Sequence, residues 1–207
     1  MLENFKGTLQ TDGYKVYQNL NTKHPITLLG CMAHARRYFE KALDNDHKRA
    51  SYALEQIQRL YVIERKIKQR KLDEQTITRY RKYFAKKILD ELHKWMKEQI
   101  HLVLPKSAIG KAIAYTLKIW NNLIRYIDDP IYQIDNNLIE NTIRPLALGR
   151  KNYLFAGSHK AAQRTAMMYS FFATCKVNDI EPLEWLTNVL KVIPDHKVSK
   201  LEELLPI

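Results

Sequence analysis

A long central segment, residues 46–129, carries apolar residues at every third or fourth position and determines more of the fold than any other part of the chain. Such spacing is typical of amphipathic helices. Pro105 ends the second of three such stripes, and Ser107 is suited to cap the helix that follows. The stripes consist of Leu54, Ile57, Leu60 or Tyr61, Ile63 and Ile67; Ile77, Tyr80, Phe84, Ile88, Leu92, Trp95 and Ile100; and Ile109, Ile113, Leu117, Trp120 and Ile124. We therefore predict an all-helical block whose aromatic side chains pack mainly in its core.

The segments on either side of this block differ from it in pattern. GTLQT, before Asp12, suggests a strand, and a short helix is expected over residues 14–20. ITLLGC is an apolar run of strand length, and the next residues, MAHARRYFEKAL, have helical character. Strands alternating with helices indicate an α/β fold, here strongly dominated by helices. The pattern divides the chain into residues 1–45, the helical block 46–129, and residues 130–207, where further helices are expected.

Charge and composition restrict the class of protein. Of 207 residues, 45% are hydrophobic, enough for a packed core, and the net charge is +12. Residues 36–100 hold 18 Lys and Arg against 10 Asp and Glu, so most of the excess lies there. Such a surface attracts nucleic acid or an anionic membrane, although a solvated helix face is an ordinary alternative. We find no signal peptide, no membrane span and no disulfide framework, and we expect a cytoplasmic protein.

Two carboxylates are the candidates for chemistry, because phosphate-binding loops and hydrolase or zinc signatures are absent from the sequence. Asp12 follows a predicted strand, where α/β sheets place functional groups, although the local sequence favours a simple Asp-Gly turn. Glu140 lies on a predicted helix that starts near Asn137, with Arg144 one turn later. The alternative is that Asn137 and Glu140 form a capping box. Because proline limits a helix, we expect Pro145 to place Gly149, Arg150 and Lys151 on a loop.

Cys31 and His34 form a Cys-x-x-His pair, which supplies two ligands where a structural zinc needs four. Cys175 would add a third ligand only if the fold brought it close. A packed cysteine and a hydrogen-bonded histidine are therefore the favoured interpretation.

Three strings, LQTDGYKVY, GCMAHARRYF and IDNNLIENTIRPLALGRKNYLFAGS, closely resemble the transposases of the insertion sequence 66 family. The resemblance extends over nearly the whole chain. It implies an RNase H-like core, here partial and interrupted by the helical insertion 46–129. It also implies an Asp-Asp-Glu triad that binds two Mg²⁺ (or Mn²⁺) ions and catalyses DNA cleavage and strand transfer. Double-stranded DNA and other copies of the protein are the implied partners.

The resemblance also assigns roles to individual residues. Asp12 in QTDGY corresponds to the second aspartate and Glu140 in DNNLIEN to the glutamate, so both are expected to be catalytic metal ligands. Arg144, Arg150 and Lys151 are expected to contact phosphate. A structural or positioning role is expected for Cys31, His34, Asp135, Asn136 and Asn137. Two metals held by clustered carboxylates stabilise the attacking and leaving oxygens of phosphodiester cleavage.

The family's first aspartate lies before the QTDGY string, and among the eleven residues that precede Asp12 here the sole carboxylate is Glu3. We therefore expect a transposase fragment with two of the three catalytic carboxylates and little or no activity by itself. The alternative is a non-catalytic remnant that binds DNA or oligomerises. A helical RNA-binding protein is less favoured, because no RNA-recognition string is present.

Overall fold

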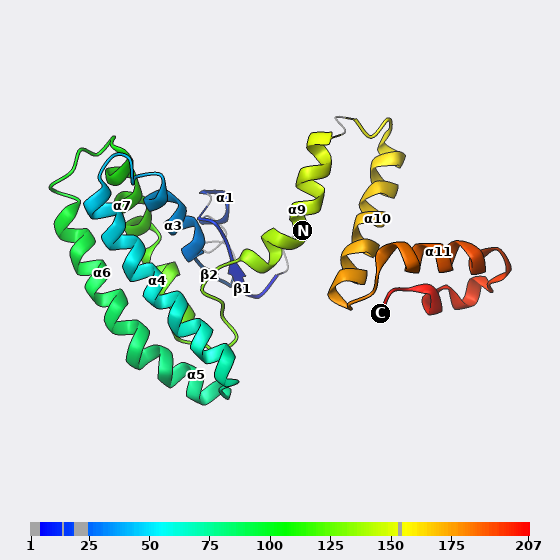
Figure 1. The fold of residues 1–207 in the computed structure, drawn as a ribbon, viewed down its shortest axis with the longest axis horizontal. Helices are drawn as coiled ribbons and strands as arrows, with labels where there is room; N and C mark the ends of the chain where they lie inside the picture. The colour runs from blue at the N-terminus through cyan, green and yellow to red at the C-terminus, as the bar shows by residue number, and fades with distance from the viewer. Residues whose placement is uncertain (1–4, 14, 19–24, 153–154) are drawn as a thin grey trace. The chain divides into compact units, whose positions relative to one another are not determined.

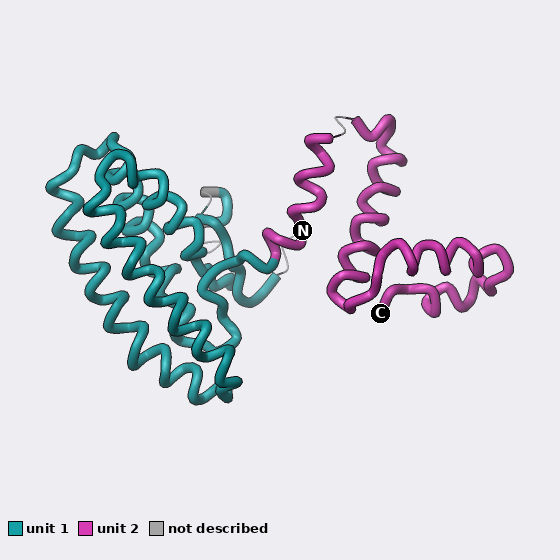
Figure 2. Tube along the Cα trace, viewed as in Figure 1, with its two compact units in different colours: residues 1–138 teal, residues 139–207 magenta. Residues whose placement is uncertain are grey.

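The computed structural model describes residues 5–13, 15–18, 25–152 and 155–207, which form two compact units (Figures 1 and 2). Unit 1 comprises residues 1–138 and unit 2 residues 139–207. The elements of unit 1 are β1 (Gly7–Gln10), α1 (Lys15–Gln18), β2 (Ile26–Leu29), α3 (Met32–Glu40), α4 (His47–Arg70), α5 (Glu74–Tyr80), the π-helical turn η1 (Arg81–Ala85), α6 (Lys86–Gln99), α7 (Ala108–Lys118), α8 (Trp120–Ile124) and the 3₁₀ turn η2 (Arg125–Ile127). The two predicted strands are confirmed. The predicted helix over 14–20 is described at Lys15–Gln18, and its other residues lie outside the described part.

β1 and β2 form a parallel pair in which Gly7 lies opposite Ile26 and Gln10 opposite Leu29. The far edge of β2 is covered by the helical block, because Asn122 accepts a hydrogen bond from the Gly30 amide at 2.9 Å and Arg125 donates to the Leu28 carbonyl at 3.2 Å. Among the described residues, the sheet consists of these two strands. An RNase H-like core remains a prediction.

The predicted helical block is confirmed and shares one core with α3. α4 packs against α3 and α6, and α7 also packs against both (Figure 1). The largest fully buried side chains of this core include Met32, Phe39, Ile57, Leu60, Leu92, Met96, Ile113, Leu123 and Tyr126. The first backbone amides of a helix have no partner within the helix, and side chains accept hydrogen bonds from them here. Ser107 caps α7 in this way, as predicted, and Asp46 caps α4. Phe84 lies in one of the predicted apolar stripes, but it is not buried in the core, since 44% of it is exposed.

The described elements of unit 2 are all helical. Its elements are α9 (Asn137–Asn152, which begins in unit 1), α10 (His159–Val177), α11 (Pro182–Val192) and the 3₁₀ turns η3 (Ile193–Asp195) and η4 (Val198–Leu204). α10 and α11 pack through Trp185, whose ring centre lies 5.4 Å from that of Phe171. The Trp185 indole also donates to the Leu204 carbonyl at 3.0 Å, which ties the chain end to α11. None of the described helices combines the length and apolar composition needed to cross a bilayer.

Candidate functional site

Asp12 lies just beyond β1, at the carboxyl end of the parallel pair, as predicted. Thr11 continues the pairing of β1 with β2, since its amide donates to the Leu29 carbonyl at 3.0 Å. The chain then turns at Gly13, whose φ of 82° is one that residues with a side chain rarely adopt. The Tyr115 hydroxyl donates to the Asp12 carbonyl and thereby connects this turn to α7. Asp12 itself is exposed, at the position where α/β sheets bind ligands.

Glu140 lies in the first turn of α9 and Arg144 lies one turn later, as predicted. The expected loop over residues 149–151 is wrong, because α9 continues through Pro145 as far as Asn152. Proline removes one hydrogen bond from the ladder, but the turns on either side keep theirs. Arg150 and Lys151 therefore lie in the last helical turn, where cations interact favourably with the helix dipole.

The proposed metal ligands belong to different units, Asp12 to unit 1 and Glu140 to unit 2. Their carboxylate oxygens are the donors that Mg²⁺ prefers. However, no group of three or more His, Cys, Asp or Glu side chains suited to a metal ion occurs among the described residues. The metal pair expected at Asp12 and Glu140 therefore remains a prediction.

The Cys-x-x-His string meets the Asp-Asn-Asn string within unit 1. The Met32 amide donates to the Ile134 carbonyl at 3.0 Å, so the start of α3 lies against the segment that leads into α9. Cys31 is fully buried at this junction. Burial raises the pKa of its thiol, and the charge of Asp135 raises it further against the opposing effect of the Asn136 amide. A neutral, packed thiol of this kind is structural and unreactive.

Asp135 connects this junction to the helical block. Its Oδ2 accepts hydrogen bonds from the Tyr61 hydroxyl at 2.7 Å and from Asn137 Nδ2 at 2.8 Å. Its Oδ1 accepts from the Asn137 amide at 3.0 Å, which satisfies a donor in the first turn of α9. Burial, the hydrogen bond to Asp135 and the charge of Asp135 raise the pKa of Tyr61, so this hydroxyl remains a donor. These contacts fix the direction in which the chain enters α9.

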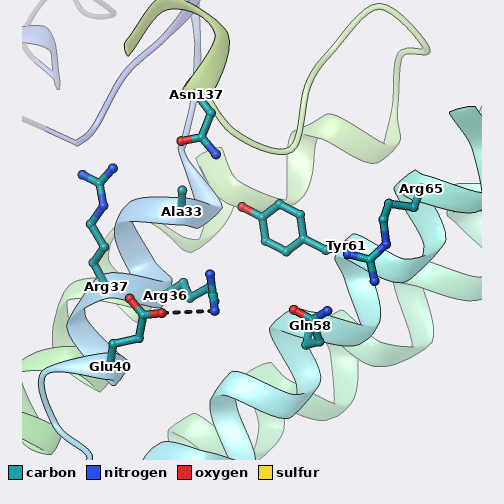
Figure 3. A pocket seen from close by; sticks show the side chains of 8 residues that line it. All are labelled: Ala33, Arg36, Arg37, Glu40, Gln58, Tyr61, Arg65 and Asn137. Atoms are coloured by element: carbon teal, nitrogen blue, oxygen red, sulfur yellow. Dashed lines mark ion pairs between the residues drawn. The ribbon is translucent and has the colours of Figure 1, made fainter. Parts of the chain in front are cut away.

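A polar cavity of about 270 Å³ adjoins the junction (Figure 3). α3 contributes Arg36 and Arg37, and α4 contributes Arg65. The residues that line it are Ala33, Arg36, Arg37, Glu40, Gln58, Tyr61, Arg65 and Asn137. Figure 3 shows the Tyr61 hydroxyl directed from α4 toward the side of the cavity that holds Ala33 and Asn137.

The three arginines of this cavity, which we call the arginine pocket, differ in their contacts. Arg36 pairs with Glu40 at 3.1 Å, and Arg37 lies 3.4 Å from the Nε2 atom of His34. Arg65 has no ion pair or hydrogen bond with any described residue. Guanidinium groups donate paired hydrogen bonds in a planar fork that matches phosphate. The pocket is therefore suited to an anion of phosphate size and geometry.

Sequence reasoning missed the arginine pocket and the role of Tyr61. The excess of Lys and Arg over residues 36–100 indicated the segment, but not which arginines line one cavity. Tyr61 occupies an apolar stripe and reads as a core residue; the available signal was that a buried tyrosine hydroxyl needs a hydrogen-bond partner.

Comparison with known families gives two matches that together span most of the chain. Residues 1–164 match the family model described as Transposase IS66 family. Residues 170–207 match the model described as IS66 C-terminal element.

The curated relatives come from Sinorhizobium fredii (strain NBRC 101917 / NGR234). Uncharacterized protein y4hP is 36% identical over an alignment of 222 residues, which includes 99% of this chain and 40% of the relative. Uncharacterized protein y4qI is 31% identical over an alignment of 214 residues, which includes 99% of this chain and 39% of the relative. The chain thus spans about two fifths of the length of these relatives. No solved structure matches the chain.

Proposed function

The chain belongs to the IS66 family of transposases, and from this premise we propose that it is a DNA-binding part of a transposase. In the longer protein, the function proposed is metal-dependent cleavage and strand transfer of double-stranded DNA. The family match does not favour the alternative of a non-catalytic remnant. We keep the three-part division of the sequence as part of this proposal, with residues 46–129 inserted into an RNase H-like core.

The arginine pocket is the observation that carries the proposal of DNA binding. Arg65, whose guanidinium has no described partner, lines this cavity from α4, and Arg36 and Arg37 line it from α3. A duplex presents a regular row of phosphates, and each phosphate bound by a protein cation releases condensed counterions. Binding through this pocket should therefore weaken steeply as salt is added.

Asp12 and Glu140 are the proposed metal ligands of the longer protein, and Mg²⁺ or Mn²⁺ is the proposed metal. When bound, such ions would stabilise the charge that develops on the oxygens of a phosphodiester under attack. Support comes from the family match and from the position of Asp12 at the carboxyl end of β1. Arg144, Arg150 and Lys151, all exposed on α9, are proposed phosphate contacts of unit 2.

Among the described residues no strand pairs with the second edge of β1, and this open edge supports the proposed core. Because the amides of Gly7 and Thr11 bond to β2, the alternating residues Thr8 and Gln10 direct their backbone groups to the opposite edge. An uncovered strand edge is a template for another strand. We propose that a further strand of the core pairs there in the longer protein.

The experiment that tests DNA binding is a salt titration with the arginine pocket altered. Fluorescence anisotropy with a labelled duplex in EDTA should show that Arg65→Ala lowers the slope of log affinity against log salt by about one. Arg65→Lys, which keeps the charge, should retain the slope. Lys106→Ala removes an equal charge from an exposed loop position and is the matched control.

Two results would contradict these proposals, and they are separable. If the unaltered chain fails to bind duplex DNA at low salt, DNA binding by this chain is wrong. If it binds but Arg65→Ala and Lys106→Ala behave identically, DNA binding stands and the arginine pocket is not the place where phosphate is bound.

A further inference from the structure

A second hollow of unit 1, of about 610 Å³, lies between α4 and the turn from α5 into α6. Aromatic side chains from the turn form one wall, and the aliphatic residues Val62, Ile63 and Ile88 form its floor. Three cations, Arg59, Lys66 and Lys87, also line it, and no carboxylate does. We call this hollow the aromatic groove.

The aromatic wall is unusually exposed for a helical bundle. Tyr83 is 77% exposed and Phe84 is 44% exposed. Their ring centres lie 4.8 Å apart in an edge-to-face arrangement, and Tyr80 lies 4.5 Å from Phe84 on the other side. The helical stripe predicted a core position for Phe84, so its ring is exposed against the general trend for aromatic residues.

The π-helical turn η1 explains this exposure. Residues 81–85 form a wider turn than an α-helix, with Arg81 and Ala85 buried and the residues between them facing outward. Arg81 is only 3% exposed and makes two hydrogen bonds to the Glu64 carboxylate, at 3.0 and 2.7 Å. It also donates to the carbonyls of Tyr126 and Asp129, both at 2.9 Å.

A buried guanidinium needs hydrogen-bond partners, and those of Arg81 hold the first residue of η1 in the core. The π-helical turn is therefore anchored rather than incidental. Such turns are rare and occur frequently at functional sites. Here the anchored turn keeps Tyr83 presented to solvent beside the cations of the aromatic groove.

The chemistry of the aromatic groove restricts its occupant. Flat rings bind flat partners by stacking, and three cations without a lining carboxylate favour an anion. Lys66 and Lys87 have no ion pair among the described residues, so their charges are available. A nucleotide combines a flat base with a phosphate, and the volume lies within the range of small-molecule sites. Because bases inside a duplex are stacked on one another, the base must be unpaired.

We propose that the aromatic groove binds an unpaired nucleotide of a DNA strand, with its base on Tyr83 and its phosphate near Lys66 and Lys87. The inference rests on the proposed function, since it assumes that DNA is the partner. It assigns the helical insertion a task separate from that of the arginine pocket, namely holding a strand that has left the duplex.

The test compares a blunt duplex with the same duplex carrying a short unpaired tail, by anisotropy with the full 207-residue chain in EDTA. The tail should increase affinity about tenfold, a typical effect of stacking one base. Tyr83→Ala should remove this gain without changing binding of the blunt duplex, and Tyr83→Phe should keep it. Leu104→Ala is the matched control, because Leu104 is also 77% exposed.

A second readout reports stacking directly. A 2-aminopurine placed in the tail should lose fluorescence on binding the unaltered chain and keep it with Tyr83→Ala.

Equal affinity for the two DNAs would overturn the proposal, and so would a gain that survives Tyr83→Ala. It would also be overturned if Tyr83→Ala altered only self-association in sedimentation experiments, since the occupant would then be a second copy. If the tailed strand binds through Tyr83 while the blunt duplex does not bind, duplex binding fails and the aromatic groove stands.

Discussion

Asp135 shows how one side chain connects three parts of unit 1. It accepts from Tyr61 on α4 and twice from Asn137 at the start of α9, next to buried Cys31. The positioning role expected for Asp135 from the sequence remains a prediction, and these contacts are compatible with it. The partner Tyr61 could not be predicted, because the two residues are 74 positions apart and nothing local connects them.

Asp46 is a residue whose contribution to stability is expected to depend on pH. Its carboxylate accepts from the Arg49 amide at 3.1 Å and pairs with the Arg49 guanidinium at 2.7 Å. The hydrogen bond with that side chain is the main reason why the pKa of Asp46 is lowered. A lowered pKa means that the stabilisation is present at neutral pH and is lost as pH falls through the folded-state value.

Replacing Asp46 by alanine should reduce the free energy of unfolding by about 1 kcal/mol at pH 7, the usual effect of removing a helix cap. The difference from the unaltered chain should shrink below the ordinary aspartate pKa of 3.8, because protonation then removes the same contacts. Urea denaturation at several pH values measures this. Asp44→Ala, at an exposed position just before α4, should be neutral, and a loss that stays constant down to acid pH would contradict the expectation.

At the scale of elements, the open edge of β1 has a measurable signature. The Thr11 amide is bonded to β2, while the Gln10 amide faces the opposite edge. Hydrogen exchange in the 207-residue chain should therefore be faster at Gln10 than at Leu9 or Thr11. Equal protection of the three amides, in a monomeric sample, would contradict the open edge.

Helices and strands with a local signal were predictable in this chain. The stripes of residues 46–129 and the Ser107 cap need only neighbouring residues, and the structure confirms them. α9 was predicted to end early, because a local rule on proline ignores the turns that continue beyond it. η1 was not predicted either. Its anchor, Arg81, depends on Glu64 and on two distant carbonyls that no periodicity displays.

At the scale of the whole molecule, the expectation concerns activity. Only Asp12 and Glu140 match the catalytic triad by motif, and no larger metal-binding group occurs among the described residues. We expect the 207-residue chain to nick supercoiled plasmid in Mg²⁺ or Mn²⁺ no faster than its Asp12→Asn and Glu140→Gln variants. Metal-dependent nicking that either variant abolishes would contradict this expectation.

The family could be recognised from three strings, but the arginine pocket and the aromatic groove could not. Each of them joins side chains of helices that meet only after folding, such as α3 with α4. Charge excess indicated the segment that contains both. Which of the many cations in this segment line each cavity depends on how the helices pack against one another.

The side-chain contacts between β1 and the segment that follows the helical block also imply an order of events during synthesis. Thr8 bonds to Tyr132 and Gln10 to the Gln133 carbonyl, across 124 and 123 positions of sequence. The helices between them are built largely from short-range contacts, which form rapidly, whereas distant pairings wait for loop closure. We therefore expect the growing chain to assemble its helical block first, while β1, although it precedes this block in the sequence, remains without these contacts until residues 132 and 133 have left the ribosome. A strand that is made before the helical block thus gains its last contacts after that block has formed.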